Sequence, residues 1–158
     1  EVLEKMKHYH YFIGVGNNNL LRRKIYEQVS MLLGEPVNAI HRTAAVSPSV
    51  ELSHGHFISA NVSINALSRL GKTAVCNTGC VIEHGCVIGD HTFIAPGAVL
   101  NGDVTIGDNT FVGANSVIKQ GVVVGKNVII GAGTVIIRDV PDGVTVVGNP
   151  GRIIRSPQ

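Results

Sequence analysis

The chain has 158 residues and a formal net charge of +2; 44% of its residues are hydrophobic, but only 4% are aromatic and none is tryptophan. This length fits one domain, or one domain with a small appendage, and the scarcity of aromatic residues argues against an ordinary aromatic-rich core. The sequence has no basic run typical of nucleic-acid binding, no apolar stretch of the roughly 18 residues that a membrane span needs, and no secretory signal, so we expect neither nucleic acid nor a membrane as a partner.

Residues 1–40 are predicted to form part of an α/β unit. The segment YFIGV at 11–15 has the composition of a strand, and the GNNN run that follows offers an asparagine as the N-cap of a helix. Apolar residues then recur with helical spacing, at Leu21, Ile25, Val29 and Leu32. Gly34 and Pro36 end this helix, and VNAI at 37–40 is expected to be a second strand that leads into the next domain.

A period of six residues follows and runs without a long insertion. Every sixth position is apolar, at Val46, Leu52, Ile58, Ile64, Leu70, Cys76, Ile82, Ile88, Ile94, Leu100, Ile106, Val112, Ile118, Val124, Ile130 and Ile136. A hexapeptide repeat is the signature of a parallel β-helix, in which each unit gives one short strand and one corner and three units close an 18-residue coil. The fold class is therefore predicted to be mainly β, a left-handed parallel β-helix over residues 41–140 of about five coils, with a short, truncated N-terminal α/β portion.

The sequence beyond Ile136 loses the six-residue period. Prolines and glycines in DVPDGVTVVGNPGRII indicate an irregular cap, which we assign to residues 141–158. The three cysteines, Cys76, Cys80 and Cys86, are an odd number without a secretory signal, which favours a reducing compartment and a cytoplasmic protein. We expect all three to be small buried residues.

His84 is the sharpest candidate for chemistry. It stands two places after an inward residue, beside Glu83, and is therefore expected at a corner, where it can face outward. Gly102 lies eighteen residues later, one coil up, so the space above the imidazole would be open and a backbone N–H would be near enough to polarise a carbonyl. Histidine is the usual general base near neutral pH. The alternative is a solvated corner histidine with no catalytic role.

Other residues give weaker signals. His54 and His56 form an H-x-H pair, but position 56 belongs to an inward column, and no histidine after His91 completes a zinc-dependent anhydrase site, so we expect no metal. Threonines at inward positions do not make the flat face of an ice-binding protein. The segment IGVGNNN lacks the third glycine of a dinucleotide fingerprint. A β-helix without catalytic function stays open at this point.

Four segments together resemble the sugar O-/N-acetyltransferases of the sialic acid O-acetyltransferase family: YFIGVGNNNLLRRKIYEQV, IHRTAAVSPSV, NTGCVIEHGCVIGDHTFIAPGAVLNGDVTIGDNTFVGANSVI and VVGNPGRII. Its best-known relatives acetylate the 4-amino group of a UDP-linked 4-amino-4,6-dideoxy sugar in bacillosamine-type pathways. The resemblance implies a homotrimer with active sites between neighbouring β-helices. Acetyl-CoA would lie along the coils, and residues 1–40 would hold part of the nucleotide-linked amino sugar.

The resemblance also implies roles for single residues. His84 matches the catalytic general base, and Glu83 stands beside it as a second catalytic candidate. Asn77, Gly16 and Asn17 are expected to bind the sugar substrate. Expected contacts to acetyl-CoA are made by Gly102, Ala114, Gly131, Gly133 and His91.

Three departures from the family pattern bear on these roles. Relatives often have a carboxylate directly after the base, where this chain has Gly85, so Glu83 or a residue of a neighbouring subunit would have to orient the imidazole. Relatives often have a second histidine nine places after the base, where this chain has Phe93, with His91 two residues earlier. The strand, turn and helix that usually open the family are missing before Glu1, so we expect either a fragment or a reduced acceptor domain.

The sequence therefore predicts an acetyl-CoA-dependent N-acetyltransferase that acts by direct transfer on a UDP-linked 4-amino sugar, with no acyl-enzyme. O-acetylation of sialic acid or another sugar hydroxyl is the first alternative. A non-enzymatic β-helix scaffold is the second.

Overall fold

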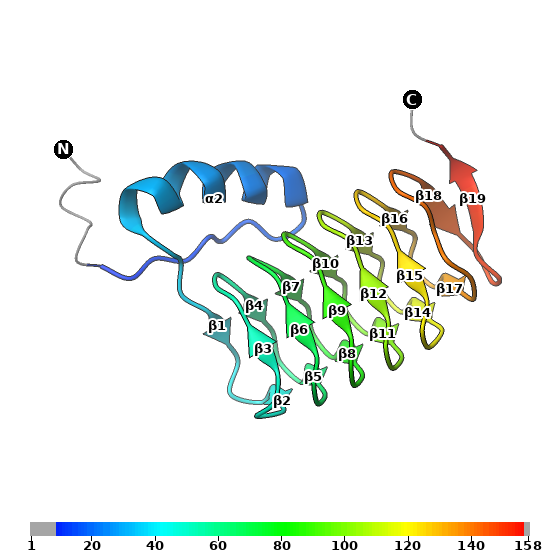
Figure 1. Ribbon diagram of the computed structural model, residues 1–158, viewed down its shortest axis with the longest axis horizontal. Coiled ribbons are helices and arrows are strands. Elements are labelled where there is room, and N and C mark those ends of the chain that lie inside the picture. Colours follow the sequence, from blue (N-terminus) through cyan, green and yellow to red (C-terminus); the bar gives the residue numbers. More distant parts are fainter. Residues whose placement is uncertain (1–8, 157–158) are drawn as a thin grey trace.

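A computed structural model describes residues 9–156 and shows a three-sided β-solenoid with one helix lying along its N-terminal half (Figure 1). Residues 1–8 of the expected N-terminal portion and 157–158 of the expected cap lie outside the described residues. Within the described range, no helix has the length and apolar composition of a membrane span.

The strands form three sheets, one on each side of the solenoid. Sheet A has eight strands, in the order β1 (Ala39–Ile40), β4 (Phe57–Ile58), β7 (Val75–Cys76), β10 (Phe93–Ile94), β13 (Phe111–Val112), β16 (Ile129–Ile130), β18 (Thr145–Val147) and β19 (Arg152–Arg155). Sheet B has six: β2 (Ala45–Val46), β5 (Ser63–Ile64), β8 (Val81–Ile82), β11 (Val99–Leu100), β14 (Val117–Ile118) and β17 (Val135–Ile136). Sheet C has five: β3 (Glu51–Leu52), β6 (Arg69–Leu70), β9 (Val87–Ile88), β12 (Thr105–Ile106) and β15 (Val123–Val124).

The register of these sheets confirms the predicted coil length. Val81 pairs with Val99 and Val99 with Val117, in parallel, so each strand pairs with the one eighteen residues away. The six strands of sheet B correspond to about six turns, slightly more than the five expected. The predicted left-handed parallel β-helix, mainly β with one short N-terminal helix, is confirmed.

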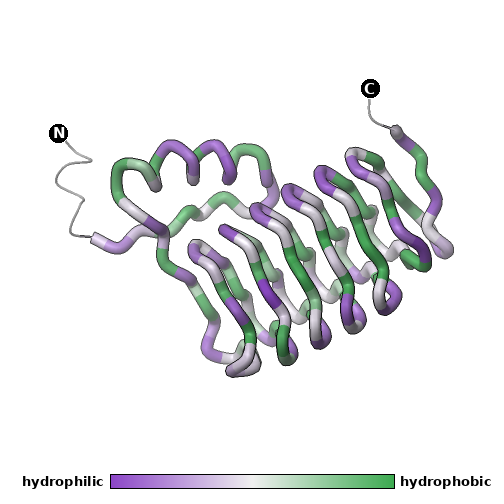
Figure 2. The backbone as a smooth tube through the Cα atoms, viewed as in Figure 1, coloured by the Kyte–Doolittle hydropathy of each residue, from purple (hydrophilic) through white to green (hydrophobic). Residues whose placement is uncertain are grey.

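The core of the solenoid consists of the predicted every-sixth residues. Ile82, Ile94 and Leu100 are completely buried, whereas Val46 and Leu52, in the first coil, are only half-buried. The cause is the alternation of side chains along a strand, which sends the second residue of each pair into the prism and the first outward. Figure 2 shows the resulting alternation of hydrophobic and hydrophilic stretches from coil to coil.

The predicted N-terminal helix is present as α2 (Asn19–Leu33). The side chain of Asn18 accepts a hydrogen bond of 2.9 Å from the Leu21 N–H, as an N-cap does, and Gly34 follows the last turn. The strand expected at 37–40 is confirmed in its second half as β1.

The strand expected at 11–15 is wrong. This segment is extended but crosses the outer face of sheet A, where it has no neighbouring strand to pair with. Ile13 is buried there, and the Phe12 ring lies 6.1 Å from that of Phe57. Its apolar composition therefore serves to cover a sheet and not to extend one.

Polar residues attach α2 to the solenoid. The buried residues of the helix are Asn19, Arg22 and Tyr26. The Arg22 guanidinium makes six hydrogen bonds: to the carbonyl oxygens of Thr73, His91, Thr92, Val15 and Gly16, and to Oδ1 of Asn19. Burial lowers the pKa of Arg22 to about 10, so this side chain stays charged at neutral pH. One residue thus holds both the helix and the turn before it.

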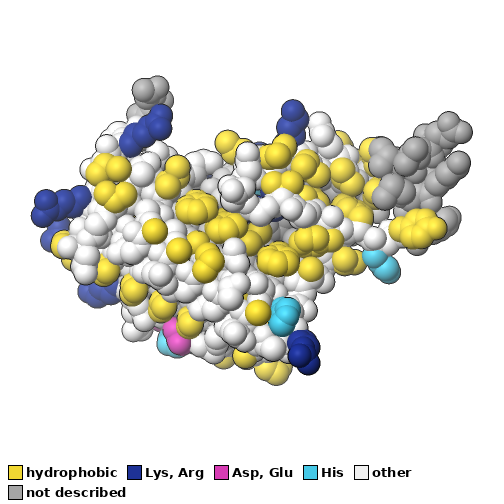
Figure 3. Space-filling view, turned by 180° about the vertical axis from the view of Figure 1, so that it is seen from behind, with side chains coloured by type: hydrophobic (Ala, Val, Ile, Leu, Met, Phe, Trp, Pro, Cys, Tyr) yellow, Lys and Arg dark blue, Asp and Glu magenta, His cyan; other side chains and the backbone are white. Residues whose placement is uncertain are grey.

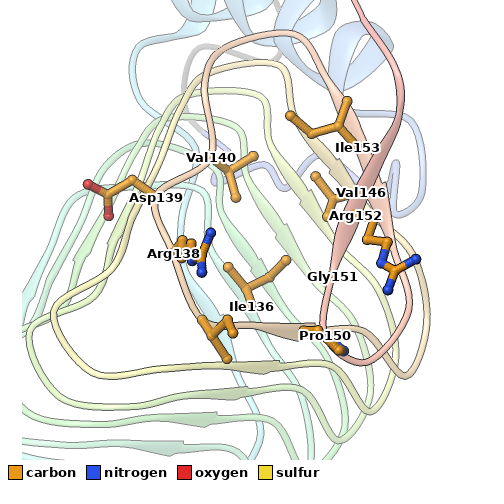
Figure 4. A pocket seen from close by; sticks show the side chains of 10 residues that line it. Ile136, Arg138, Asp139, Val140, Val146, Pro150, Gly151, Arg152 and Ile153 are labelled. Atoms are coloured by element: carbon orange, nitrogen blue, oxygen red, sulfur yellow. The ribbon is translucent and has the colours of Figure 1, made fainter.

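The C-terminal end closes with an antiparallel pair, β18 and β19, instead of a further coil. Beneath this pair lies a pocket of about 490 Å³, with Ile136, Val140 and Val146 on its apolar side and Arg138 and Arg152 at its rim (Figure 4).

Candidate active site

Three columns of corners, here called edges, run along the solenoid where two sheets meet. Residues eighteen apart lie one above the other in each edge, as the pairing of the strands on either side requires. In the middle coils the A–B edge comprises residues 77–80, 95–98 and 113–116, the B–C edge 83–86 and 101–104, and the C–A edge 71–74 and 89–92.

His84 lies on the B–C edge, with its side chain 56% exposed. Its imidazole lies against Gly102 of the next coil, where a Cβ atom would come within 2.5 Å of Nε2 and 2.6 Å of Cε1. Any other residue at position 102 would therefore displace the ring. The structure brings these two predicted site residues together as the coil stacking indicated.

Asp103 is a neighbour of His84 that the sequence reasoning missed. Its Oδ1 lies 3.9 Å from Nδ1 of His84. Asp103 stacks directly above Gly85, and a Cβ on Gly85 would collide with the Asp103 carboxylate. The signal that could have found it is the coil length of eighteen residues, which places Asp103 one coil above Gly85.

Glu83, the other catalytic candidate, engages the solenoid through its main chain. Its N–H donates to the carbonyl oxygen of Leu100 (2.9 Å), and its own carbonyl accepts from the Ser68 hydroxyl (2.8 Å). Within the described residues, the Glu83 carboxylate makes no hydrogen bond to His84 or to any other group. Asp103 is thus the carboxylate that the structure brings to the imidazole.

Four other predicted site residues gather on the A–B edge: Asn77, Ala114, Gly131 and Gly133. Asn77 caps its own corner, since its Oδ1 accepts from the Thr78 N–H (2.8 Å). Gly133 lies one coil above Asn115 and donates its N–H to the Ala114 carbonyl oxygen (2.8 Å). The width of sheet B separates these residues from His84, so a single chain does not bring them together.

Gly16 and Asn17 lie elsewhere again, at the start of α2. Asn17 lines a groove of about 440 Å³ whose other walls are amide side chains, one apolar side chain of α2 and two apolar side chains of sheet A: Asn18, Asn19, Leu20, Asn109, Phe111, Asn127 and Ile129. The carbonyl of Gly16 is bound by Arg22 (2.7 Å), which fixes the turn. Figure 3, seen from behind the view of Figure 1, shows apolar side chains forming a band across the molecule. The outward residues of sheet A include the exposed Ile40, Phe57 and Ile129.

His91 occupies the C–A edge, beneath α2, and is buried. Its Nδ1 lies 2.6 Å from the Thr73 hydroxyl and its ring 5.5 Å from that of Tyr26, and burial lowers its pKa. The structure does not bring His91 to His84. Its contacts instead support the helix.

Cys86 is buried two residues after His84. Burial raises the pKa of the Cys86 thiol to about 11, and Sγ donates to the carbonyl oxygen of Asn101 (3.2 Å), so this thiol is a poor nucleophile.

The histidine pair at 54 and 56 does not form a metal site. The His54 Nε2 atom lies 3.3 Å from a Glu35 carboxylate oxygen, whereas His56 is buried inside the prism. In the part of the chain that the structure describes, no three histidine, cysteine or acidic residues are grouped to hold a metal ion.

Comparisons with known proteins agree with this architecture. Residues 103–138 match the model of the hexapeptide repeat of succinyl-transferase. The chain is 37% identical to a GDP-perosamine N-acetyltransferase of Caulobacter crescentus, a histidine-to-alanine variant solved with CoA and GDP-perosamine; the match covers 98% of this chain and 73% of that one, with a TM-score of 0.94. The acetyltransferase domain of PglB from Neisseria gonorrhoeae, solved with acetyl coenzyme A, is 35% identical over 97% of this chain and 75% of its own, with a TM-score of 0.90.

A curated relative adds a sequence match. The chain is 37% identical over 81 residues to a GDP-perosamine N-acetyltransferase of Escherichia coli O157:H7. That match covers 51% of this chain and only 37% of the relative's length.

Proposed function

The chain belongs to the hexapeptide-repeat acetyltransferase family, and from this premise we propose that it transfers the acetyl group of acetyl-CoA to the amino group of a nucleotide-linked amino sugar. The observation that carries the proposal is His84, an exposed imidazole on the B–C edge that lies against Gly102 of the next coil. Both substrates are cytoplasmic metabolites, so the reaction would take place in the cytoplasm.

The proposed chemistry is a direct transfer. The sugar amine attacks the thioester carbonyl, the new N–C bond forms, the C–S bond breaks, and CoA leaves as a thiolate. His84 takes the proton that the amine loses, which is the role of a general base. The N–H of Gly102 has no protein acceptor among the described residues and would donate to the developing oxyanion.

The division of the site between two edges supports a homotrimer. The outward residues of sheet B form a stripe of half-buried valines: Val81, Val99, Val117 and Val135. Three copies packed around this face would bring the A–B edge of one, with Asn77 and Ala114, to the B–C edge of the next, with His84. Acetyl-CoA would then run along the cleft between two copies, past Gly131 and Gly133, and His91 would have no part in it.

The acceptor is proposed to enter by the groove at the start of α2, where Asn17 lies. A helix N-terminus favours phosphate groups, and the amides and the Phe111 ring offer contacts to a nucleotide. Two of the relatives named above, from Caulobacter crescentus and Escherichia coli O157:H7, are GDP-perosamine N-acetyltransferases, whereas the sequence suggested a UDP-linked amino sugar. GDP-perosamine is therefore the first acceptor to test.

A panel of acceptors tests this proposal. Wild-type protein with acetyl-CoA would be given GDP-perosamine, a UDP-linked 4-amino-4,6-dideoxy sugar and free sialic acid, and the products identified by mass spectrometry. The proposal predicts an N-acetylated product from at least one amino sugar. Acetylation of sialic acid alone would replace it with the O-acetyltransferase alternative, and acetyl-CoA binding with no product from any acceptor would refute the choice of acceptor. A protein that binds no acetyl-CoA would be a scaffold.

A further inference from the structure

We propose that Asp103 is the positioning residue of His84: its carboxylate accepts a hydrogen bond from the Nδ1–H group, so that Nε2 is left without a proton and can take one from the amine. This inference rests on the proposed function, because it assigns the orientation of that function's base. The residue directly after His84 is a glycine, so the orienting carboxylate comes from the next coil.

The geometry of the ring supports this arrangement. Nδ1 is the nitrogen near Asp103, and Nε2 is the nitrogen over Gly102, on the side proposed for the thioester. A neutral imidazole carries its proton on one nitrogen only, and the partner of one nitrogen decides which form is present. A carboxylate at Nδ1 therefore selects the form in which Nε2 can act as a base.

The other aspartates at corners show what a purely structural role looks like. Asp90, Asp108 and Asp142 each accept a hydrogen bond from a main-chain N–H of the neighbouring coil, at 2.8 to 3.0 Å. Asp139, on the same edge as Asp103, does likewise with Val123 (2.9 Å). Among the described residues, the Asp103 carboxylate accepts no such bond, and its contact is His84. Asp103 therefore does not connect neighbouring coils through a side-chain hydrogen bond as the other aspartates do.

The backbone explains how an aspartate can stand there. Position 103 has a φ of 60° and position 85 a φ of 69°, both in the left-handed region. Aspartate tolerates this region better than most residues, and glycine adopts it freely. Because a Cβ at 85 would occupy the place of the Asp103 carboxylate, the carboxylate in this position requires a glycine at 85.

The distance of 3.9 Å is longer than a hydrogen bond, which spans about 2.7–3.2 Å. Both side chains are more than half exposed, at 56% and 59%, so rotation about their χ angles can close the gap. Catalytic hydrogen bonds are often long in the free protein and shorten when substrate excludes water.

The first test does not depend on turnover. Protein labelled with ¹⁵N-histidine would be examined by long-range ¹H–¹⁵N NMR above pH 8, with His84→Ala used to assign the His84 signals. The inference predicts the Nδ1–H form of His84 in the wild type and a shift toward the Nε2–H form in Asp103→Asn, a substitution that retains tolerance of the left-handed backbone. The same form in both proteins would overturn it.

The second test measures rates with acetyl-CoA and the acceptor from the panel. Asp103→Asn should lower kcat about 10-fold with little change in KM, since an orienting group acts on the reaction more than on binding. The matched control Asp139→Asn removes a carboxylate from the same edge and should leave kcat unchanged. Equal losses in both variants would mean that Asp103 acts only through stability.

A residue exchange provides rescue. In the double variant Gly85→Asp with Asp103→Gly, the carboxylate returns beside His84 on a backbone of the same left-handed type, and kcat should recover most of the loss seen in Asp103→Gly. Failure to recover, in a protein that melts as the wild type does, would contradict the inference. If the wild type acetylates no acceptor, the proposed function fails, and the NMR result still decides the orientation of His84.

Discussion

The solenoid and the N-terminal helix are held in place by opposite kinds of interaction. Apolar side chains such as Ile94 and Leu100 fill the prism coil after coil, and each is completely buried. In α2, by contrast, Leu20 and Met31 are exposed at 66% and 81%, while the charged Arg22 is buried. Stability in the solenoid is therefore spread over many equivalent positions, whereas α2 is attached through three buried residues, of which Arg22 makes the most hydrogen bonds.

This difference matters for the proposed function. The solenoid supplies the fixed distances between His84, Gly102 and Asp103, and α2 with its preceding turn supplies the acceptor groove. The proposed catalytic edge thus belongs to the solenoid, and the proposed acceptor groove to the part of the molecule where α2 begins.

Truncation of a prism residue should have the largest effect. Leu100→Ala is expected to lower the free energy of unfolding by about 2–5 kcal/mol, because it leaves a cavity in a packed interior. Ile129→Ala, at an outward position that is 49% exposed, is the matched control and should cost far less. Urea denaturation measures both. Equal losses would contradict the packing of every-sixth residues into the prism.

Acidification should have the second-largest effect on stability, through protonation of His56. Burial lowers the pKa of His56 to about 4, well below the usual histidine value of about 6.5. The unfolded chain therefore takes up a proton at a higher pH than the folded one, and stability falls as the pH drops from about 7 to 4, by about 3 kcal/mol for a shift of this size. His56→Leu should remove that part of the pH dependence, and His41→Gln, at an exposed histidine, should retain it. Denaturation curves at several pH values give the free energy of unfolding as a function of pH. The same pH dependence in His56→Leu and the wild type would show that His56 is not the group responsible.

Loss of the Arg22 contacts should destabilise α2 without destabilising the solenoid. In Arg22→Ala, α2 is expected to open about 2 kcal/mol more easily, because the buried carbonyl oxygens lose their donor. Hydrogen exchange should then be faster in Leu21–Leu33 and unchanged in the strands around Ile94. Arg23→Ala, which removes an exposed pair with Glu27, serves as the control. Uniformly faster exchange over the whole chain would contradict the separate attachment of α2.

Thr92→Val should have the smallest effect and the opposite sign. The Thr92 hydroxyl is buried and has no hydrogen-bond partner in the part of the chain that the structure describes. Replacing it with a methyl group of similar shape should stabilise the solenoid by about 1 kcal/mol or leave it unchanged. The thermal midpoint provides the measurement, and a clear drop would indicate that the hydroxyl has a partner, such as a buried water molecule.

The two regions also differ in how far the sequence predicts them. The column from Val46 to Ile136 reveals the coil length, the inward residues and the stacking of His84 under Gly102, because each follows from a repeat of fixed period. The helix could be predicted from its cap and spacing. The covering role of residues 11–15 and the burial of Arg22 could not be predicted, since both depend on which surface the segment crosses. Asp103 also follows from the period, since it stands eighteen residues after Gly85, but its distance from His84 along the sequence conceals the contact. The division of the remaining candidates between two edges appears only in three dimensions.

The most direct test of the proposed function is the rate of CoA release from acetyl-CoA with GDP-perosamine, for the wild type and for His84→Ala, in proteins with equal thermal midpoints. The account predicts steady release by the wild type and a loss of about 100-fold or more in the variant, the scale expected when a general base is removed. Equal rates in the two proteins would contradict the assignment of His84 as the base.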